Sequence, residues 1–234
     1  MLFYKYKPMK IDHIYCINLK RSIERRHDME KEFTREKVNV EFVDACDGKL
    51  IGRDGIYGCA RSHLDVWKDI VDKGYTNALI LEDDMRLAHN FKRKIKELNE
   101  PEEDWDTIHF YSWMTVPLED YNSQLIRGKT LGTPAYVISN SCARRLHLLE
   151  PDDMGAQIDL FMIVKLNLNT FFVKEHLALL NYKNTLHSEI GFNNDTSRLF
   201  EQTNFLHMFK WADHHFGHFI LSLLLIALIF YIKK

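Results

Sequence analysis

The stretch "ALILEDDMRL", residues Ala78 to Leu87, joins an apolar run to three consecutive acids. Ala78 to Leu81 is almost continuously apolar, which is typical of a strand that is covered on both faces. Glu82, Asp83 and Asp84 follow directly. Because ligands of open α/β sheets lie outside the carboxyl ends of the strands, these three acids fall where a binding site is expected.

The chain around this stretch alternates between short β-favouring runs and segments with helical spacing. Such alternation predicts a layered α/β domain with a largely parallel sheet. The patterns predict strands at 13–19, 40–45, 78–81, 105–112 and 134–139, and helices at 20–33, 60–73, 90–100 and 140–150.

Composition narrows the class of protein. The chain has 234 residues, enough for one α/β domain, and its net charge of -2 gives no reason to expect a nucleic-acid partner. Its four cysteines form no C-x-x-C pair and no cluster at zinc-finger spacing, so we expect them to be reduced. The first residues lack the apolar core of a secretory signal, which predicts a body made in the cytosol.

The far end of the chain has a different composition. Residues 219–232 carry no charge, and counting from 216 gives a helix of roughly 25 Å, against a hydrocarbon core of about 30 Å. We therefore expect a membrane-associated protein with a single-pass anchor at 216–232, preceded by an aromatic and histidine-rich linker at 195–215. The alternative is a C-terminal helix buried in a core or an oligomer.

The acidic triplet needs a source of positive charge. Three adjacent acids repel one another, and a hard divalent metal with oxygen ligands would offset that repulsion. Mg²⁺ or Mn²⁺ bound by one or two carboxylates commonly completes its shell with phosphate oxygens, which favours a nucleotide-diphosphate substrate. A solvated acidic turn is the alternative.

Four stretches together resemble one known family. "IYCINLKRSIERR", "FVDACDGK", "GCARSHLDVWKDI" and "ALILEDDMRL" occur in the order and spacing seen in glycosyltransferase family 25, which includes lipooligosaccharide and procollagen galactosyltransferases. The resemblance is strong over residues 11–91 and continues weakly to about residue 192. One of these motifs alone would be weak, but the combination is specific.

The resemblance implies a GT-A-like fold at residues 1–194, with a Rossmann-type nucleotide-sugar domain and a mixed, mostly parallel sheet. It also implies an inverting, metal-dependent transfer of a hexose, commonly galactose from UDP-galactose, to a hydroxyl group of a glycan, glycolipid or protein. Carried over to this sequence, the expected donor-binding residues are Asn18, Leu19, Arg21, Asp44, Ser62, His63, Glu82 and Asp83.

The resemblance also suggests metal ligands and a base. Asp83 and Asp84 match the acidic motif that binds Mn²⁺ or Mg²⁺ in such enzymes, His187 lies where a late histidine completes the shell, and Glu82 would orient its neighbours. An inverting enzyme needs a general base outside the metal cluster. Asp159 matches the family's later acidic position, with Glu189 in reserve.

Several neighbouring residues have a simpler structural interpretation. Arg25 and Arg26 could support the donor electrostatically, but a solvated helix face is favoured for both, and we expect Trp67 in the core. Gly58 and Cys59 are read either as a plain helix-entry turn or as backbone that approaches a ligand closely. Asp152 and Asp153 resemble a second metal motif, but a helix-ending acidic turn is favoured.

Two other functions remain open. A catalytically silent descendant would keep the fold as a membrane-bound binding or scaffold protein. A metal-dependent phosphohydrolase would explain the clustered acids, but not the other three matching stretches.

Overall fold

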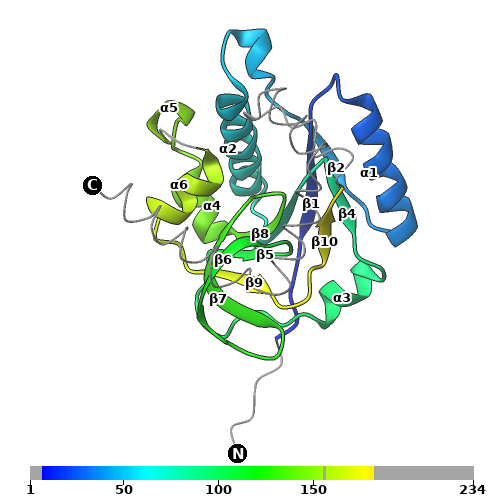
Figure 1. Ribbon diagram of the computed structural model, residues 1–234, viewed down its shortest axis with the longest axis vertical. Coiled ribbons are helices and arrows are strands. Elements are labelled where there is room, and N and C mark those ends of the chain that lie inside the picture. The colour runs from blue at the N-terminus through cyan, green and yellow to red at the C-terminus, as the bar shows by residue number, and fades with distance from the viewer. Residues whose placement is uncertain (1–6, 155–156, 182–234) are drawn as a thin grey trace, which may run out of the picture.

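A computed structural model describes residues 7–154 and 157–181 (Figure 1). Its centre is an eight-stranded sheet with the order β2-β1-β3-β8-β5-β9-β7-β6, and β4 and β10 form a separate antiparallel pair. The strands are β1 (His13–Asn18), β2 (Glu41–Asp44), β3 (Asn77–Glu82), β4 (Met85–Leu87), β5 (Thr107–His109), β6 (Trp113–Glu119), β7 (Leu125–Leu131), β8 (Ala135–Ser139), β9 (Thr170–Val173) and β10 (Ala178–Leu180).

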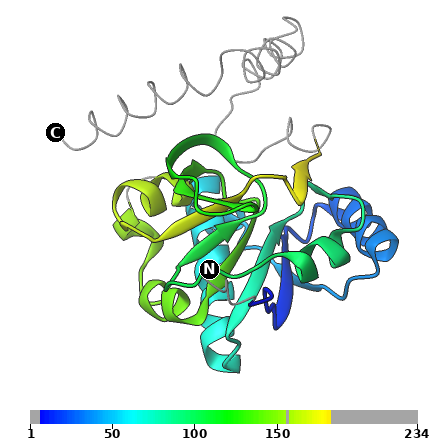
Figure 2. The same cartoon turned by 90° about the horizontal axis from the view of Figure 1, so that it is seen from below.

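Helices cover both faces of this sheet, and Figures 1 and 2 show α1 and α6 on opposite sides of it. One face carries α1 and α3, and the other carries α2, α4, α5 and α6. The helices are α1 (Ile23–Glu36), α2 (Gly55–Lys73), α3 (Phe91–Glu97), α4 (Asn140–Leu146), α5 (Pro151–Met154) and α6 (Ile158–Val164), with a short 3₁₀ helix η1 (Gly48–Ile51) before α2.

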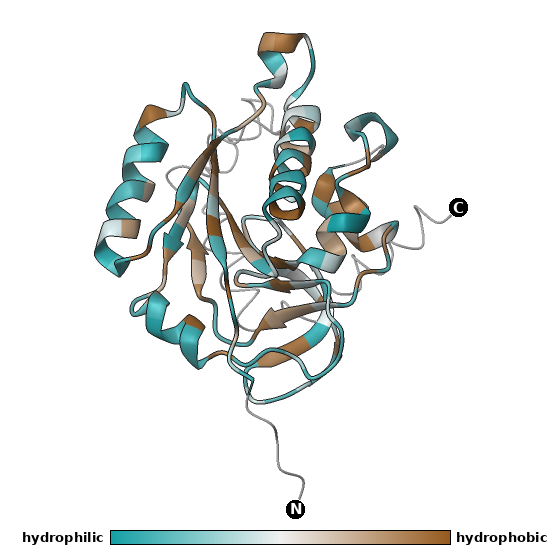
Figure 3. Ribbon diagram, turned by 180° about the vertical axis from the view of Figure 1, so that it is seen from behind, coloured by the Kyte–Doolittle hydropathy of each residue, from teal (hydrophilic) through white to brown (hydrophobic). Residues whose placement is uncertain are grey.

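The two cores follow from the alternation of side chains along β3. Leu79 and Leu81 pack with the side chains of α1 and α3, whereas Ala78 and Ile80 pack with those of α2 and α4. All four side chains are fully buried, as the continuous apolar run predicts. Figure 3 shows the central strands mainly hydrophobic and the surface of α1 mainly hydrophilic.

The sheet is mixed. Six of its eight strands run in one direction, and only β7 and β8 run against them. Since these two are inserted between strands of the other direction, four of the seven pairings are antiparallel. The prediction of a mixed, mostly parallel sheet is therefore confirmed: most strands share one direction, and each of the four antiparallel pairings involves β7 or β8.

Most predicted elements are present, with shifted ends. Helix α2 begins at Gly55 rather than Ala60, because the Asp54 side chain accepts a hydrogen bond from Tyr57 N and caps the helix. Strands β4, β6, β7, β9 and β10 were not predicted. The hairpin of β6 and β7 is irregular, with two register shifts in β6 around Pro117.

The order β2-β1-β3 opens a crevice at one end of the sheet. The chain passes from β1 to β2 through α1 on one face, and from β2 to β3 through α2 on the other. The connections after β1 and β2 therefore lead to opposite faces of the sheet, and the strand ends between them stay uncovered. Asn18 and Glu82 end the two strands that border this crevice.

The expected single-pass membrane anchor needs correction. In residues 7–154 and 157–181, no helix is both long enough and apolar enough to span a bilayer. The segments 195–215 and 216–232, on which that expectation depended, lie outside the described residues. The structure thus gives the anchored localisation no support.

Gly58 lets the loop after β2 lie directly against α2. A Cβ atom at this position would come within 2.6 Å of the Cys46 carbonyl oxygen and 3.0 Å of Gly48 N. One turn on, the Ser62 hydroxyl donates to Gly58 O at 2.6 Å and accepts from Cys46 N at 2.9 Å. Gly58 is thus part of α2, and the close approach that it permits is to the backbone of the loop after β2.

Replacing Gly58 with alanine should destabilise the protein by about 1–3 kcal/mol, because the added methyl group overlaps backbone that cannot rotate away. Urea unfolding of the full chain measures this change. Lys68→Ala, on an exposed position of the same helix, is the matched control, and losing its surface ion pair with Asp72 should change stability by less than about 0.5 kcal/mol. Equal stability of the two variants would contradict the packing described for Gly58.

Candidate functional site

A cleft of about 100 Å³ lies at the carboxyl ends of β1, β2 and β3. Its walls come from the segment after β1, the loop after β2 and the first turns of α2, and the acids after β3 lie between them. Of the predicted site residues, the cleft brings together Leu19, Arg21, Ser62, His63, Glu82, Asp83 and Asp84.

Asp83 is buried beside one cation and one amide. Asn18 Nδ2 donates to Asp83 Oδ2 at 2.7 Å, and Arg25 Nη2 lies 3.0 Å from Asp83 Oδ1. Burial raises the pKa of Asp83 above its usual value, although Arg25 and Asn18 act to lower it. The site therefore holds this carboxylate by direct contacts with α1 and β1.

Arg25 links the two aspartates. The same Nη2 atom lies 3.6 Å from Asp84 Oδ2, so both carboxylates face one guanidinium group. The Arg25 side chain is only 19% exposed, and its placement on a solvated face was wrong. Arg26 stays at the surface as predicted, paired with Glu30 and lying over the Phe42 ring.

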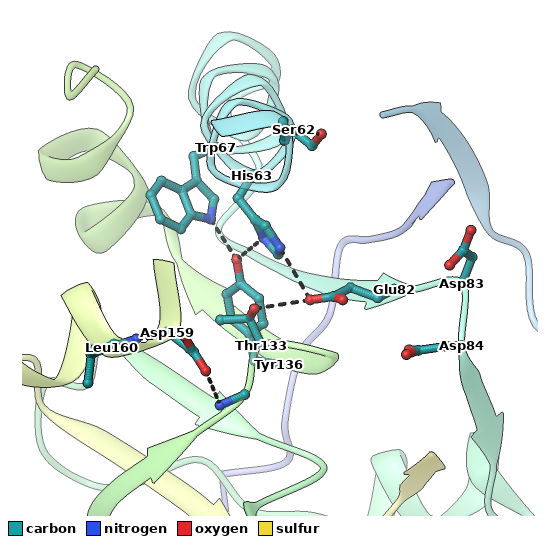
Figure 4. Close-up of polar contacts among 12 residues, drawn as sticks. Ser62, His63, Trp67, Glu82, Asp83, Asp84, Thr133, Tyr136, Asp159 and Leu160 are labelled. Carbon is teal, nitrogen blue, oxygen red and sulfur yellow. Dashed lines mark hydrogen bonds and ion pairs between the residues drawn. The ribbon is translucent and has the colours of Figure 1, made fainter. Parts of the chain in front are cut away.

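Glu82 points toward α2, in contact with His63 and Thr133 (Figure 4). Thr133 Oγ1 donates to Glu82 Oε1 at 3.0 Å, and His63 Nε2 lies 3.5 Å from the same oxygen. Burial acts to raise the pKa of Glu82, but His63, Thr133 and Arg25 together hold it below the usual value. Glu82 is thus an ionised group with partners of its own.

The hydroxyl group of Tyr136 on β8 fixes His63. Both His63 Nδ1 and Trp67 Nε1 lie 2.8 Å from Tyr136 Oη (Figure 4). Trp67 is fully buried, which confirms its predicted place in the core. His63 is also buried and held within the protein, so its ring orientation is set before any ligand binds.

Asp159 lies apart from the cleft, beside a smaller pocket that His109, Lys129 and Thr170 also line. Its Oδ2 accepts from Gly132 N at 3.0 Å and its Oδ1 from Leu160 N at 2.7 Å. Burial raises the pKa of Asp159, and these two backbone N–H groups act against the increase. The carboxyl group is therefore fixed in orientation and takes up a proton more readily than an exposed one.

His109 and Lys129 were missed as candidates. Burial lowers the pKa of His109 to about 4, so its ring is neutral at physiological pH, and burial also lowers the pKa of Lys129. His109 ends β5. The strand predicted at 105–112 runs past His109, so its position in the sequence gave no signal that it lies at a strand end.

Other predicted residues lie elsewhere. Asp44 ends β2 but forms an ion pair with Lys20 and does not line the cleft. Asp152 and Asp153 belong to the first turn of α5 rather than to the end of a helix, and Asp152 pairs with Arg53 at the surface. His187 and Glu189 lie outside the described residues.

A comparison with known protein families gives one match, to a model described as "Glycosyltransferase family 25 (LPS biosynthesis protein)" over residues 11–56 and 53–162. Among curated proteins, the chain is 33% identical to procollagen galactosyltransferase 2 of Mus musculus over 129 residues, covering 43% of this chain and 21% of that protein. It is 26% identical to inactive glycosyltransferase 25 family member 3 of the same species, covering 68% and 33%. The chain thus spans about a fifth to a third of these relatives.

Likeness to solved structures is weak. A glycosyltransferase involved in glycosylation of the major capsid of PBCV-1 has 14% identity and a TM-score of 0.37, covering 57% of this chain and 62% of that one. A mutant Drosophila β-1,4-galactosyltransferase 7, solved with manganese, UDP-Gal and xylobiose, has 12% identity and a TM-score of 0.36, covering 80% and 79%. No inference follows from likeness at this level. The family model, by contrast, spans well over half of the sequence, and the chain belongs to glycosyltransferase family 25.

Proposed function

We propose that the protein is a metal-dependent, inverting glycosyltransferase that moves a hexose from a UDP-sugar to a hydroxyl group of a glycan, glycolipid or protein. One observation carries the proposal: Asp83 and Asp84 line a cleft at the carboxyl ends of parallel strands, in a chain of family 25. Several relatives bear the name procollagen galactosyltransferase, which favours galactose as the sugar.

The residues around Asp83 and Asp84 fit a divalent cation. Both carboxylates converge on the positive charge of Arg25, at 3.0 and 3.6 Å, so the fold already directs them to one region. Carboxylate oxygens are ligands that Mn²⁺ and Mg²⁺ accept. Bound there, the cation would act as a Lewis acid and offset the charge that develops on the departing UDP.

The donor sugar nucleotide would lie along the end of β1. Asn18 closes that strand and holds Asp83 in place, while Leu19 and Arg21 line the cleft beside it. Arg21 pairs with Asp47 from the facing loop, at 2.6 Å. Its guanidinium group brings positive charge to the wall of the cleft that would face the diphosphate.

Asp159 is the proposed general base. It would take the proton of the acceptor hydroxyl as that oxygen attacks the anomeric carbon and the bond to UDP breaks. Two backbone N–H groups fix its orientation, and its raised pKa makes it a better proton acceptor than an exposed carboxylate. Glu189, outside the described residues, stays the reserve.

A second candidate is a catalytically silent binding protein. Three relatives whose names call them inactive or probable inactive members of the family match 66 to 68% of this chain. Similarity to the family therefore does not by itself decide between an active enzyme and a silent binding protein. Binding of UDP-sugars without release of UDP, with or without Mn²⁺, would identify this function instead.

Asp84→Asn should lower Mn²⁺-dependent release of UDP from UDP-galactose by about 100-fold or more, because one carboxylate that offsets leaving-group charge is lost. The rate of UDP release in the full-length protein measures the effect. Asp153→Asn removes an exposed acid and should leave the rate unchanged. Unchanged release in Asp84→Asn would remove this residue from the metal site.

Asp159→Asn should abolish sugar transfer while UDP binding stays nearly intact, since an amide cannot accept the hydroxyl proton. In the unsubstituted protein the base works only when ionised. As the pH is lowered, transfer should be lost when Asp159 becomes protonated. Because the pKa of Asp159 is raised, this loss should begin at a higher pH than for an ordinary aspartate, whose pKa is about 3.9. Equal loss of transfer and UDP binding in the variant would contradict a base role.

A further inference from the structure

A second group of potential metal ligands lies in the cleft, apart from Asp83 and Asp84. A sulfur atom of Cys59, a ring nitrogen of His63 and a carboxylate oxygen of Glu82 all lie within 4.8 Å of one another. Cys59 and His63 are four residues apart in α2, so they share one face of that helix. Glu82 approaches the same face from the end of β3.

The Nε2 atom of His63 gives an independent indication. His63 is 1% exposed, and this nitrogen has no hydrogen-bond partner among the described residues. Buried polar atoms nearly always have a partner, so the lack of one at this nitrogen points to a ligand that binds there. The atom is aimed at Glu82, 3.5 Å away.

That separation suits two ligands of one ion better than a hydrogen bond. A charge-assisted bond between nitrogen and a carboxylate oxygen is normally about 2.7–2.9 Å long. Two ligands held about 2.0–2.1 Å from a tetrahedral metal lie about 3.4 Å apart. The observed distance of 3.5 Å agrees with the second geometry.

The other side of the His63 ring is arranged as in a metal ligand. Histidines that bind metals usually donate from their second ring nitrogen to an oxygen, which fixes the tautomer. Tyr136 Oη lies 2.8 Å from Nδ1, and it can accept that hydrogen beside the one from Trp67 because a hydroxyl oxygen has two lone pairs. With a metal at Nε2, the ring would carry its hydrogen on Nδ1, and the lone pair of Nε2 would be directed to the ion.

We propose that Cys59, His63 and Glu82 bind a Zn²⁺ ion, at a site separate from the cation site proposed at Asp83 and Asp84. The Cys59 thiol would release its proton to solvent and form the S–Zn bond as a thiolate. One thiolate, one carboxylate and a neutral imidazole balance the two positive charges. Thiolate and imidazole ligands favour zinc over Mg²⁺ and Mn²⁺, which keeps the two sites chemically distinct.

Such an ion would connect α2 to the end of β3 at the cleft. Two of its ligands belong to the helix and the third to the strand, so it would fix the distance between the two walls. With three protein ligands, a fourth position remains for water or for a group of a bound molecule.

Cobalt substitution tests the site in the full-length protein. After removal of bound metal with a chelator, Co²⁺ should be taken up with a thiolate-to-cobalt charge-transfer absorption, which one equivalent of Zn²⁺ abolishes. Cys59→Ser should lose this absorption. Cys46→Ser, which changes a thiol in the same cleft but outside the three-residue group, should keep it.

Zinc titration calorimetry gives the second measurement. Cys59→Ser and His63→Asn should each weaken Zn²⁺ binding by more than the 10- to 100-fold that changes around a metal's ligands typically produce. Glu82→Gln should weaken it as well, and it tests the site without altering the helix. Near-ultraviolet circular dichroism checks that each variant is folded.

The outcomes separate this site from the proposed transferase activity. Zinc binding that persists in Asp84→Asn but is lost in Cys59→Ser supports the site whether or not UDP is released. No uptake of Co²⁺ or Zn²⁺, or a cobalt absorption unchanged by Cys59→Ser, would overturn the zinc proposal and leave the transferase proposal untouched.

Discussion

Glu82, Asp83 and Asp84 place three like charges side by side at the end of the central strand, and the surrounding elements are arranged to offset their repulsion. Arg25 from α1 and Asn18 from β1 contact Asp83. Glu82 faces His63 from α2 and accepts a hydrogen bond from Thr133, just before β8. The end of β3 therefore fixes how the elements on both faces of the sheet meet.

The same arrangement divides the acids between two environments. Glu82 is the last residue of β3 and turns to the helix α2, whereas Asp83 and Asp84 form the turn after the strand and face Arg25 of α1. The environment of Asp83 and Asp84 consists of carboxylate oxygens and the guanidinium group of Arg25. The environment of Glu82 adds the sulfur of Cys59 and a ring nitrogen of His63. A short run of acids can thus provide two sites with different chemical preferences.

Much of this organisation could be predicted from local pattern. The apolar run before Glu82 identified β3, and its position at a strand end identified the cleft. Local pattern could not show that β8 runs against its neighbours, because side-chain periodicity is the same in either direction. Nor could it show that Arg25 turns from solvent toward the acids, since its partner Asp83 lies 58 positions later in the chain.

Strand β6 forms one edge of the sheet in the described part of the chain, and it carries exposed apolar side chains at Trp113 and Leu118. A regular edge of this kind would offer unpaired N–H and C=O groups to another molecule. Pro117 supplies no N–H group, and the register shifts on either side of it break the spacing of the others. The irregular hairpin therefore makes β6 a poorer template for pairing with a strand of another molecule than a regular edge would be.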